Sequence, residues 1–514
     1  MDKNDLIKIG NARDLADKTE RRVYRLFEIL PGLLAWATLL GVIFLSWASP
    51  VGIAFFIIAF DIYWLLKTIF LSLHLRSSWS RIKKIMAIDW LAKLKDEPAK
   101  NKWNDVYHLV VLPMYKENYS LVSATFESLL KINYPLDKLI VVLGVEERAG
   151  KEAAKVAQKI KEKYSRHFFK FMTTVHPADI AGELAGKGSN ETWAGKRAKE
   201  QLIDKLGISY ENILVSVFDV DSVFYSDYFA RLTYVFLATP DRYHCSFQPV
   251  PIFNNNIWDA PSFSRVVAQS GTFWHMMQQE RPERLSTFSS HSMSFKAIVE
   301  MNWWSTRNVS EDSRIFWQAL LFYDCRYRAV PLHYPVSMDA NLARSWWQTI
   351  INVYKQQRRW GWGVENVPYL LFGFWRNKAI SFRDKVFWAF QQLEGFWSWA
   401  TNALIIFMLG WMPLLLGGHK FNMTQLSYNL PQITRIIMTA AMVGVASSAI
   451  YGLLILPPRP AERKKGQYVL MVAQWILMPV TIIIFGALPG LEAQTRLIFG
   501  KYMGFWVTPK TRKK

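Results

Sequence analysis

Two carboxylates one residue apart, Asp219 and Asp221, form the pattern in this sequence that most directly suggests chemistry. They follow the apolar run 213–218, which predicts a buried strand. On an extended segment, side chains two residues apart point the same way, so both carboxylates would face one ligand. Two hard oxygen donors suit Mg²⁺ or Mn²⁺ bridging a diphosphate, whose oxygens would complete the coordination shell. A solvated strand end is the alternative explanation of the same spacing.

Two further patterns place charged and aromatic residues on predicted helices. Glu311 and Asp312 open an apolar helical stretch, although acidic residues in a first turn stabilise any helix. Gln356, Arg359 and Trp360 are spaced to share one helical face. An amphipathic helix at a membrane surface, anchored by Trp and Arg, is the alternative explanation. Each pattern alone has a structural explanation, so the elements around them matter.

The segment 107–224 alternates short apolar runs with helical stretches. Strands are predicted at 108–113, 139–143, 168–174 and 213–218, and helices near 118–132, 150–163 and 191–206. Strands separated by helices indicate βαβ units and a parallel sheet. Ligands of such sheets bind beyond the carboxyl ends of the strands. The residues Tyr115, Glu117 and Glu146 and the acidic pair all follow predicted strands and are therefore expected at this edge.

Most of the other apolar residues are gathered in long uncharged runs. Membrane spans are predicted near 29–48, 51–73, 395–418, 436–458 and 468–491. Lys and Arg cluster before the first span, after the second and between the fourth and fifth, which places the block 100–345 in the cytoplasm. Five spans would leave the basic C-terminal tail outside. Pro479 and Pro489 in the last run leave open a re-entrant or broken segment.

The chain carries 62 Lys and Arg against 41 Asp and Glu, a net charge of +21. Cytoplasmic flanks that face anionic lipid explain this excess. No nucleic-acid motif accompanies it, so no nucleic-acid partner is expected. Two cysteines without ligand spacing argue against a disulfide scaffold and a structural zinc site.

The predicted organisation has six parts: a cytoplasmic N-terminal segment 1–28, a transmembrane hairpin 29–73, a cytoplasmic domain 100–345, interfacial amphipathic helices 346–394, a C-terminal transmembrane region 395–491 and a basic tail 492–514. The three chemical patterns occur in one order, on the cytoplasmic block and the interfacial helices. They are framed on both sides by predicted spans.

In this arrangement the sequence resembles the membrane-bound family 2 glycosyltransferases, the group with the cellulose, hyaluronan and chitin synthases. The family motifs are matched by Pro113-Met-Tyr115-Lys116-Glu117, Asp219-Val-Asp221, Ser310-Glu311-Asp312 and Gln356-Gln-Arg-Arg359-Trp360. Further matches are Tyr134-Pro135, Lys187-Gly-Ser-Asn190, Gln248-Pro249 and Phe505-Trp-Val-Thr-Pro-Lys510. The resemblance covers roughly 100–370 and, in outline, the spans.

The resemblance implies an α/β fold of the GT-A type, Rossmann-like with a mostly parallel sheet, set between N-terminal and C-terminal transmembrane helices. It implies an inverting hexosyltransferase that uses a nucleotide-diphosphate sugar in a single, metal-assisted displacement. The implied catalytic residues are Asp312 as general base with Glu311, and the implied Mg²⁺ or Mn²⁺ ligands are Asp221 and Asp219. The implied donor-binding residues are Tyr115, Glu117, Glu146, Lys187 and Asp219, and those for acceptor and diphosphate are Gln356, Arg359 and Trp360.

Several alternatives remain open at this point. The acceptor is either a growing β-linked polysaccharide, for which the Q-x-x-R-W pattern is typical, or a lipid-linked sugar that receives one residue, which the small number of spans favours. The resemblance implies a UDP-sugar before a GDP-sugar, because the family commonly uses UDP-sugars. Glu146 stands where the family usually has an acidic turn, and this departure leaves a GDP-sugar as the alternative. Membrane lipids are further expected partners, and the expected location is the plasma (bacterial inner) membrane.

Two other classes of protein compete with the enzyme. A transporter would have polar residues inside its spans and inverted repeats, whereas these runs are nearly free of charge. A non-catalytic sugar-binding module would be expected to have lost Asp221 or Asp312, and the sequence keeps both.

Overall fold

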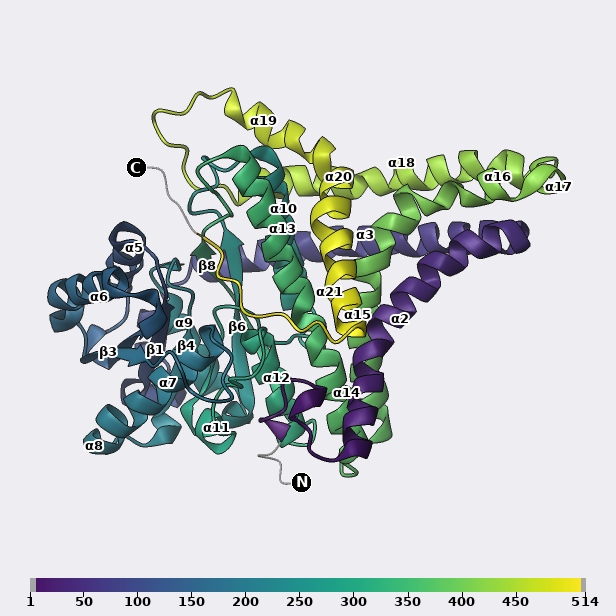
Figure 1. The fold of residues 1–514 in the computed structure, drawn as a ribbon. Helices are drawn as coiled ribbons and strands as arrows, with labels where there is room; N and C mark the ends of the chain where they lie inside the picture. The colour runs from purple at the N-terminus through teal and green to yellow at the C-terminus, as the bar shows by residue number, and fades with distance from the viewer. Residues whose placement is uncertain (1–5, 510–514) are drawn as a thin grey trace.

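An eight-stranded sheet forms the centre of the fold in the computed structural model, which describes residues 6–509 (Figure 1). The strands are β1 Tyr107–Met114, β2 Leu139–Glu146, β3 Lys170–His176, β4 Ile213–Val217, β5 Val223–Phe224, β6 Cys245–Phe253, β7 Ser292–Ser294 and β8 Arg328–Met338. Their order is β3-β2-β1-β4-β7-β6-β8-β5. The pairs β3–β2, β2–β1, β1–β4 and β6–β8 are parallel, and the pairs that involve β7 or β5 are antiparallel. The predicted α/β class with a mostly parallel sheet is confirmed.

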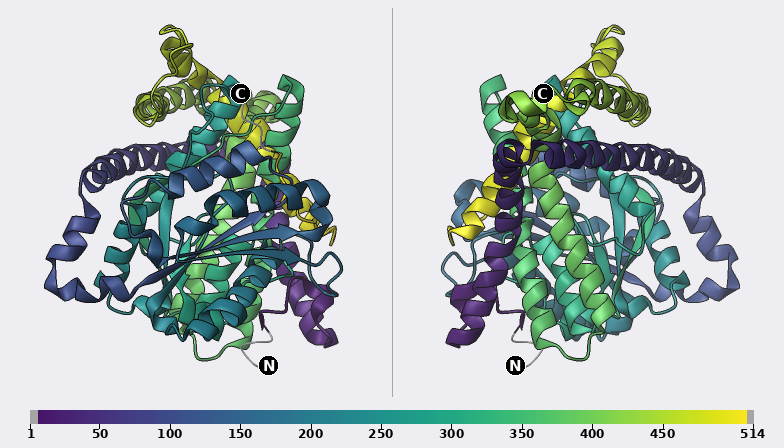
Figure 2. Two further views of the ribbon diagram at one scale, coloured as in Figure 1. Left: turned by 90° about the vertical axis from the view of Figure 1, so that its left-hand side faces the viewer. Right: turned by 90° about the vertical axis from the view of Figure 1, so that its right-hand side faces the viewer.

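The central strands are apolar on both sides because helices cover both faces of the sheet (Figure 2). In β1, Val110 and Leu112 point into one core while Leu109 and Val111 point into the other, as alternation along a strand requires. The first core also receives α5 (Tyr119–Leu129), α6 (Lys151–Tyr164) and α9 (Tyr228–Ala238). The second receives α7 (Lys187–Ala198), α11 (Phe295–Glu300) and α12 (Glu311–Phe322).

Two predicted elements are displaced along the chain. The third strand begins at Lys170 rather than 168, because Phe168 packs into the first core before the strand starts. The third helix begins at Lys187 rather than near 191. It then passes through a π-helical turn, Lys199–Ile203, into α8 (Asp204–Leu206). The earlier start matters, because it places Lys187 in the first helical turn.

Among residues 6–509, four helical segments are long and apolar enough to cross a membrane: α2 (Lys18–Ala48), α3 (Pro50–Met86), α18 (Gln425–Leu454) and the composite segment Gln467–Ile498. A fifth candidate bends by 51° between α15 (Phe382–Phe407) and Leu409–Leu416, which includes α16 (Met412–Leu416). The hairpin between α2 and α3 turns at Ser49, and Pro50 occupies the first turn of α3. The predicted spans 29–48 and 51–73 are the apolar parts of these two longer helices.

The composite C-terminal segment is not one regular helix. It consists of α19 (Gln467–Ala473), a 3₁₀ turn, α20 (Met478–Ile482), a π-helical turn and α21 (Leu488–Ile498). Pro479 and Pro489 lie in the first turns of α20 and α21, where a proline is tolerated. α18 packs along α3, whereas α21 packs against α2 and α13 (Trp346–Gly361) (Figure 1). By length and composition this segment is nevertheless one candidate span, and among the described residues the bend above 40° lies between α15 and Leu409–Leu416.

Three helices connect the sheet to the long apolar helices. α10 (Ser262–Gln279) packs on β6, α3 and α18, and α14 (Asn366–Arg376) packs on α2 and α12. α13 lies beside α21, so the region predicted as interfacial contains α13, α14 and the first part of α15. Residues 501–509, which follow α21, have no regular secondary structure and run back across the sheet domain (Figure 1). Lys510, part of the last matched pattern, lies outside the described residues.

Candidate active site

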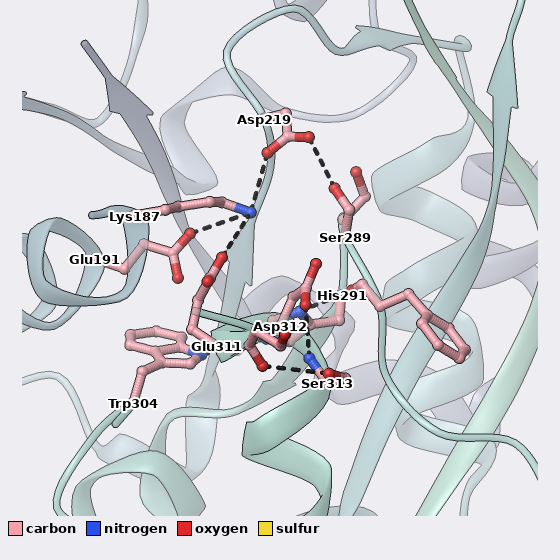
Figure 3. A network of polar contacts seen from close by, with 12 residues as sticks. Lys187, Glu191, Asp219, Ser289, His291, Trp304, Glu311, Asp312 and Ser313 are labelled. Atoms are coloured by element: carbon pink, nitrogen blue, oxygen red, sulfur yellow. Dashed lines mark hydrogen bonds and ion pairs between the residues drawn. The ribbon is translucent and has the colours of Figure 1, made fainter. Parts of the chain in front are cut away.

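Lys187, Asp219 and Glu311, which are far apart in the sequence, meet in one cluster (Figure 3). The Nζ atom of Lys187 lies 3.0 Å from Asp219 Oδ1 and 3.6 Å from Glu311 Oε1. Glu191, one turn further along α7, places its Oε1 atom 3.4 Å from the same nitrogen. One ammonium group is therefore shared by three carboxylates. These four residues are called the charged cluster below.

Close packing of α7 brings the charged cluster together. A Cβ atom on Gly188 would lie 2.8 Å from Glu311 Cβ and 2.9 Å from Ser305 O, so the absence of a side chain allows α12 to approach. Asn190 Nδ2 donates a hydrogen bond to Gly144 O at 2.9 Å, which ties α7 to β2. The first turn of α7 is thereby fixed beside the ends of the central strands.

The charged cluster is shielded from water. The side chain of Lys187 is 10% exposed, that of Glu311 is 2% exposed and that of Glu191 is fully buried. Burial disfavours the ammonium ion, but Asp219, Glu191 and Glu311 outweigh it and hold the pKa of Lys187 well above its usual value. Burial raises the pKa of Glu311 to about 7, although the charges of Lys187 and Arg359 oppose this. The cluster keeps its cation and contains a carboxyl that titrates near neutral pH.

Asp219 and Asp221 lie in a turn after β4 and not on an extended strand. The turn is closed by Ser222 N–H, which donates to Asp219 O at 2.9 Å. The Asp219 side chain is 27% exposed, and its Oδ2 accepts a hydrogen bond from Ser289 Oγ at 3.1 Å. Asp221 is fully buried, and its Oδ2 accepts from Asp339 N–H at 3.2 Å. The predicted extended geometry is therefore wrong, because the turn gives the two carboxylates different surroundings.

The donor set at this turn fits a divalent cation that prefers oxygen. Asp219 and Asp221 supply carboxylates, the ligand type that Mg²⁺ and Mn²⁺ favour. Within residues 6–509, no group of three or more His, Cys, Asp or Glu side chains is arranged to hold a metal ion. The two carboxylates would therefore hold such an ion only together with oxygens of a ligand.

Asp312 lies in the first turn of α12, beside Glu311. It is partly exposed, and its Oδ1 accepts a hydrogen bond from Ser313 N–H at 2.8 Å. Its carbonyl oxygen accepts from Thr287 Oγ1 at 2.6 Å. The same loop carries Ser289, the partner of Asp219, so a single loop contacts residues of both acidic patterns (Figure 3).

Gln248 and His291 hold this loop in place. Gln248 Oε1 accepts a hydrogen bond from Phe288 N–H at 2.9 Å. His291 Nδ1 lies 3.1 Å from Phe288 O, and Trp304 Nε1 donates to His291 Nε2 at 3.3 Å. Burial and the charge of Lys187 lower the pKa of His291 to about 3. The ring is therefore neutral, and it donates through Nδ1 and accepts through Nε2.

The pattern on α13 faces the sheet domain. Gln356 Oε1 accepts a hydrogen bond from Asn341 Nδ2 at 3.3 Å, and Trp360 packs against the first core. The guanidinium of Arg359 lies 5.0 Å from the ring centre of Phe505. Gln356, Arg359 and Trp360 are each partly exposed, and each contacts a neighbouring element.

Glu492 of α21 fixes the other side of α13. Its Oε1 atom accepts hydrogen bonds from Arg358 Nη1 at 2.7 Å and Arg496 Nε at 2.9 Å. Its Oε2 atom accepts from Tyr354 OH at 2.9 Å. Adjacent arginines on α13 thus have different partners: Arg358 holds the helix on α21, and Arg359 contributes its charge at the charged cluster.

At the ends of β1 and β2, Tyr115 and Glu146 contact Arg148, and Glu117 contacts the backbone of Tyr115. The backbone N–H of Tyr115 donates to Glu117 Oε2 at 2.7 Å. Arg148 Nε donates to Glu146 Oε2, and its guanidinium lies 4.7 Å from the ring centre of Tyr115. The carboxylate of Glu146 is therefore already paired with the guanidinium of Arg148. These four residues are called the strand-end group below.

The C-terminal segment crosses the site between α7 and α13. A Cβ atom on Gly186 would lie 2.8 Å from Phe505 Cβ, which shows how closely this segment approaches the start of α7. On its other side, Phe505 lies over Arg359. Upstream, Tyr502 OH donates to Glu28 Oε2 at 2.9 Å and so ties the segment to α2.

Sequence reasoning missed Glu191, Ser289, His291 and Arg148. Glu191 was hidden because the helix was expected to begin there, and its spacing from Lys187 has meaning only on a helix that begins earlier. Arg148 follows Glu146 closely enough to have been considered with it. Ser289 and His291 lie in an irregular loop whose contacts are set by the tertiary structure.

No family model matches the sequence, and no curated protein sequence matches it. Among solved structures, the chain is similar to the mannosyltransferase PcManGT from Pyrobaculum calidifontis in complex with GDP-Man and Mn²⁺, at 14% identity and a TM-score of 0.39, with 84% of this chain and 100% of that chain covered. It is also similar to TarS of S. aureus in complex with UDP-GlcNAc, at 10% identity and a TM-score of 0.38, with 77% and 93% covered.

Proposed function

We propose that this protein is an inverting glycosyltransferase that moves a sugar from a nucleotide-diphosphate sugar to an acceptor at a membrane surface. The observation that carries the proposal is the charged cluster, in which Lys187, Asp219 and Glu311 come from three elements with Asp312 beside them. The cluster follows the end of a parallel strand, where ligands of α/β sheets bind.

Asp312 is the general base of the proposed reaction. The acceptor hydroxyl must lose its proton as it attacks the anomeric carbon, and a positioned carboxylate can take that proton. Asp312 is partly exposed, whereas the neighbouring Glu311 is buried and engaged with Lys187, so Asp312 is the carboxylate that an acceptor can reach. A single displacement needs one base and no enzyme nucleophile, and the product is inverted at the anomeric carbon.

Positive side chains hold the leaving diphosphate. Lys187 offers a compact ammonium on the α7 side, and Arg359 offers a planar fork on the α13 side. A divalent cation at Asp219 and Asp221, Mg²⁺ or Mn²⁺, would supply further neutralisation of the charge that develops on the diphosphate. Ser289 orients the Asp219 carboxylate by its hydrogen bond.

The strand-end group binds the nucleoside. Tyr115 and Arg148 already stack, so a flat base has an aromatic ring and a guanidinium plane to lie against. Glu117 and Glu146 offer carboxylate acceptors to the N–H of a base or the hydroxyls of a ribose. A UDP-sugar is the proposed donor, before a GDP-sugar.

The acceptor approaches from the side of the long apolar helices. α13 connects the sheet domain to this side, and its Trp360 offers an aromatic face for a sugar ring. We propose that the four long apolar helices cross the plasma membrane and that the sheet domain lies in the cytoplasm, since the flanking basic clusters favour that side. The proposed acceptor is a growing β-linked polysaccharide, with a lipid-linked sugar as the alternative.

The test is a donor panel. Detergent-purified protein is incubated with Mn²⁺ and a series of UDP- and GDP-sugars, and free nucleotide and product size are measured together. Release from one donor with a high-molecular-mass product is the expected result. Release only after a lipid extract is added, with one sugar per lipid, would replace the polysaccharide by the lipid-linked acceptor. No release with any donor and either acceptor would contradict the proposed function.

A further inference from the structure

The carboxylate of Asp219 is held on both of its oxygens by other side chains. Lys187 Nζ lies 3.0 Å from Oδ1, and Ser289 Oγ donates to Oδ2 at 3.1 Å. A cation that binds Asp219 must therefore compete with an ammonium group that is already part of the protein. That ammonium is fixed in its charged form, because three carboxylates surround it.

Glu191 is a buried partner that keeps Lys187 in the site. It is fully buried, and neither of its carboxylate oxygens makes a hydrogen bond within the described part of the chain. Its ion pair with Lys187, at 3.4 Å, is what compensates its burial. Lys187 can release Asp219 and remain with Glu191 and Glu311, because both lie within 3.6 Å of the ammonium, but it cannot leave altogether without stranding Glu191.

We propose that Lys187 is a built-in competitor of the divalent cation at Asp219 and that Glu191 is the partner that retains it when the cation binds. This inference rests on the proposed function, because it assumes that a metal–nucleotide complex binds at the acidic turn. It concerns the order of events there and not the chemistry of transfer. Glu191 is a positioning residue in this scheme, since it acts through Lys187.

Strong coupling between metal and nucleotide follows. Two carboxylates, one of them engaged by Lys187, bind a divalent cation weakly. A diphosphate removes both causes of this weak binding. It adds oxygen ligands for the metal, and it offers Lys187 an anionic partner in place of Asp219. Each ligand should therefore raise the affinity for the other by the same factor. If Lys187 is the competitor, its removal should let Mn²⁺ bind without nucleotide.

The test measures Mn²⁺ binding by electron paramagnetic resonance on the detergent-purified full chain, with and without UDP or GDP. The double variant Lys187→Met/Glu191→Gln removes the ammonium together with its buried partner, so no Glu191 carboxyl is left in the core without Lys187. We expect this variant to bind Mn²⁺ alone about tenfold more tightly than the unmodified protein, and nucleotide to add correspondingly less. Equal or weaker binding of Mn²⁺ alone would overturn the inference.

Glu191→Gln alone gives a second, opposite prediction. Without the Glu191 carboxylate, Lys187 has only Glu311 to pair with when it releases Asp219. Mn²⁺ alone should therefore bind no more tightly than in the unmodified protein. The gain in Mn²⁺ affinity on adding UDP should fall several-fold. An undiminished gain would overturn the role given to Glu191. This variant keeps the inference testable if thermal unfolding shows that the double variant does not fold.

A matched control lies on the same stretch of chain. Arg197 and Glu200 form an ion pair of 2.9 Å that is largely exposed. The variant Arg197→Met/Glu200→Gln therefore makes the same two types of substitution at an ion pair outside the charged cluster. It should leave Mn²⁺ binding unchanged. If the unmodified protein binds Mn²⁺ with nucleotide but the Lys187 variants match it, only this inference fails. If Mn²⁺ binds under no condition, the metal-assisted function fails with it.

Discussion

The charged cluster and the strand-end group differ in how the protein holds them. In the charged cluster, one ammonium serves three carboxylates, and two of these are almost completely buried. In the strand-end group, one arginine that is 28% exposed pairs with Glu146 and lies over Tyr115. Buried charges that compensate one another leave little freedom to move, whereas a partly exposed stacked cation can shift at little cost. Changes in the cluster should therefore alter turnover, and changes in the strand-end group should alter donor affinity.

The largest expected effect comes from the base beside the charged cluster. Asp312→Asn should lower kcat by roughly a thousandfold, because proton transfer by a positioned group contributes that order of acceleration. Nucleotide binding, measured by calorimetry, should be unchanged. Asp241→Asn, at an exposed position, serves as the control and should leave kcat intact. Turnover that survives in Asp312→Asn would remove Asp312 from the mechanism.

Two adjacent arginines on α13 allow a matched comparison. Arg359→Lys replaces a planar fork by a point charge and should lower kcat/KM by roughly tenfold to a hundredfold, the range for a lost charged hydrogen bond. Arg358→Lys keeps an ion pair with Glu492 and should have a much smaller effect. Steady-state kinetics of both variants would check this. Equal effects would show that α13 matters only as a packed helix.

Arg148 tests the strand-end group. Arg148→Ala removes the cation that stacks on Tyr115 and pairs with Glu146. The donor KM should therefore rise about tenfold, the size expected when one cation–π contact and one charged hydrogen bond are lost together. The value of kcat should change little, because the charged cluster is untouched. The difference between the affinities for UDP and for GDP, measured by competition, should also become smaller. A fall in kcat with constant KM would contradict the division between the two regions.

The smallest expected effect is a pH-dependent change in stability. Burial raises the pKa of Glu311 from 4.5 to about 7, so the folded protein holds this proton more strongly than the unfolded chain does. Raising the pH from about 4.5 to 7 therefore favours unfolding, and Glu311→Gln removes this contribution. Thermal unfolding of both proteins should show an advantage of Glu311→Gln that grows over this range and is constant above it. An advantage that grows toward acid pH would contradict the burial of an ionisable Glu311.

The four neighbouring parallel strands β1 to β4 were predictable, whereas β5 to β8, which include the parallel pair β6–β8, were not. β1, β2 and β4 are short apolar runs that stand out in the sequence because both sheet faces are covered. β7 has only three residues, two of them serines, and it is held by tertiary contacts such as the hydroxyl–hydroxyl hydrogen bond between Ser216 and Ser292 at 2.7 Å. No periodicity can reveal a strand of this kind.

The candidate site was predictable in its residue types and less so in its geometry. The order of the acidic patterns and of Lys187 was enough to select residues that the fold brings together. The relation of Asp219 to Asp221 was wrong, because a hydrogen bond from Ser222 closes a turn where alternation was assumed. The contact of Phe505 with Arg359 joins positions far apart in the chain, and spacing alone does not encode such a contact.

The anomeric configuration of the product tests the central claim most directly. With the donor identified by the panel, nuclear magnetic resonance of the product formed by the purified protein reports whether the configuration at the transferred carbon is changed. A single displacement with Asp312 as the one base predicts an inverted product, β-linked from an α-linked donor. Retention of the donor configuration would contradict the account, because a single back-side displacement by a hydroxyl that Asp312 deprotonates inverts the anomeric carbon.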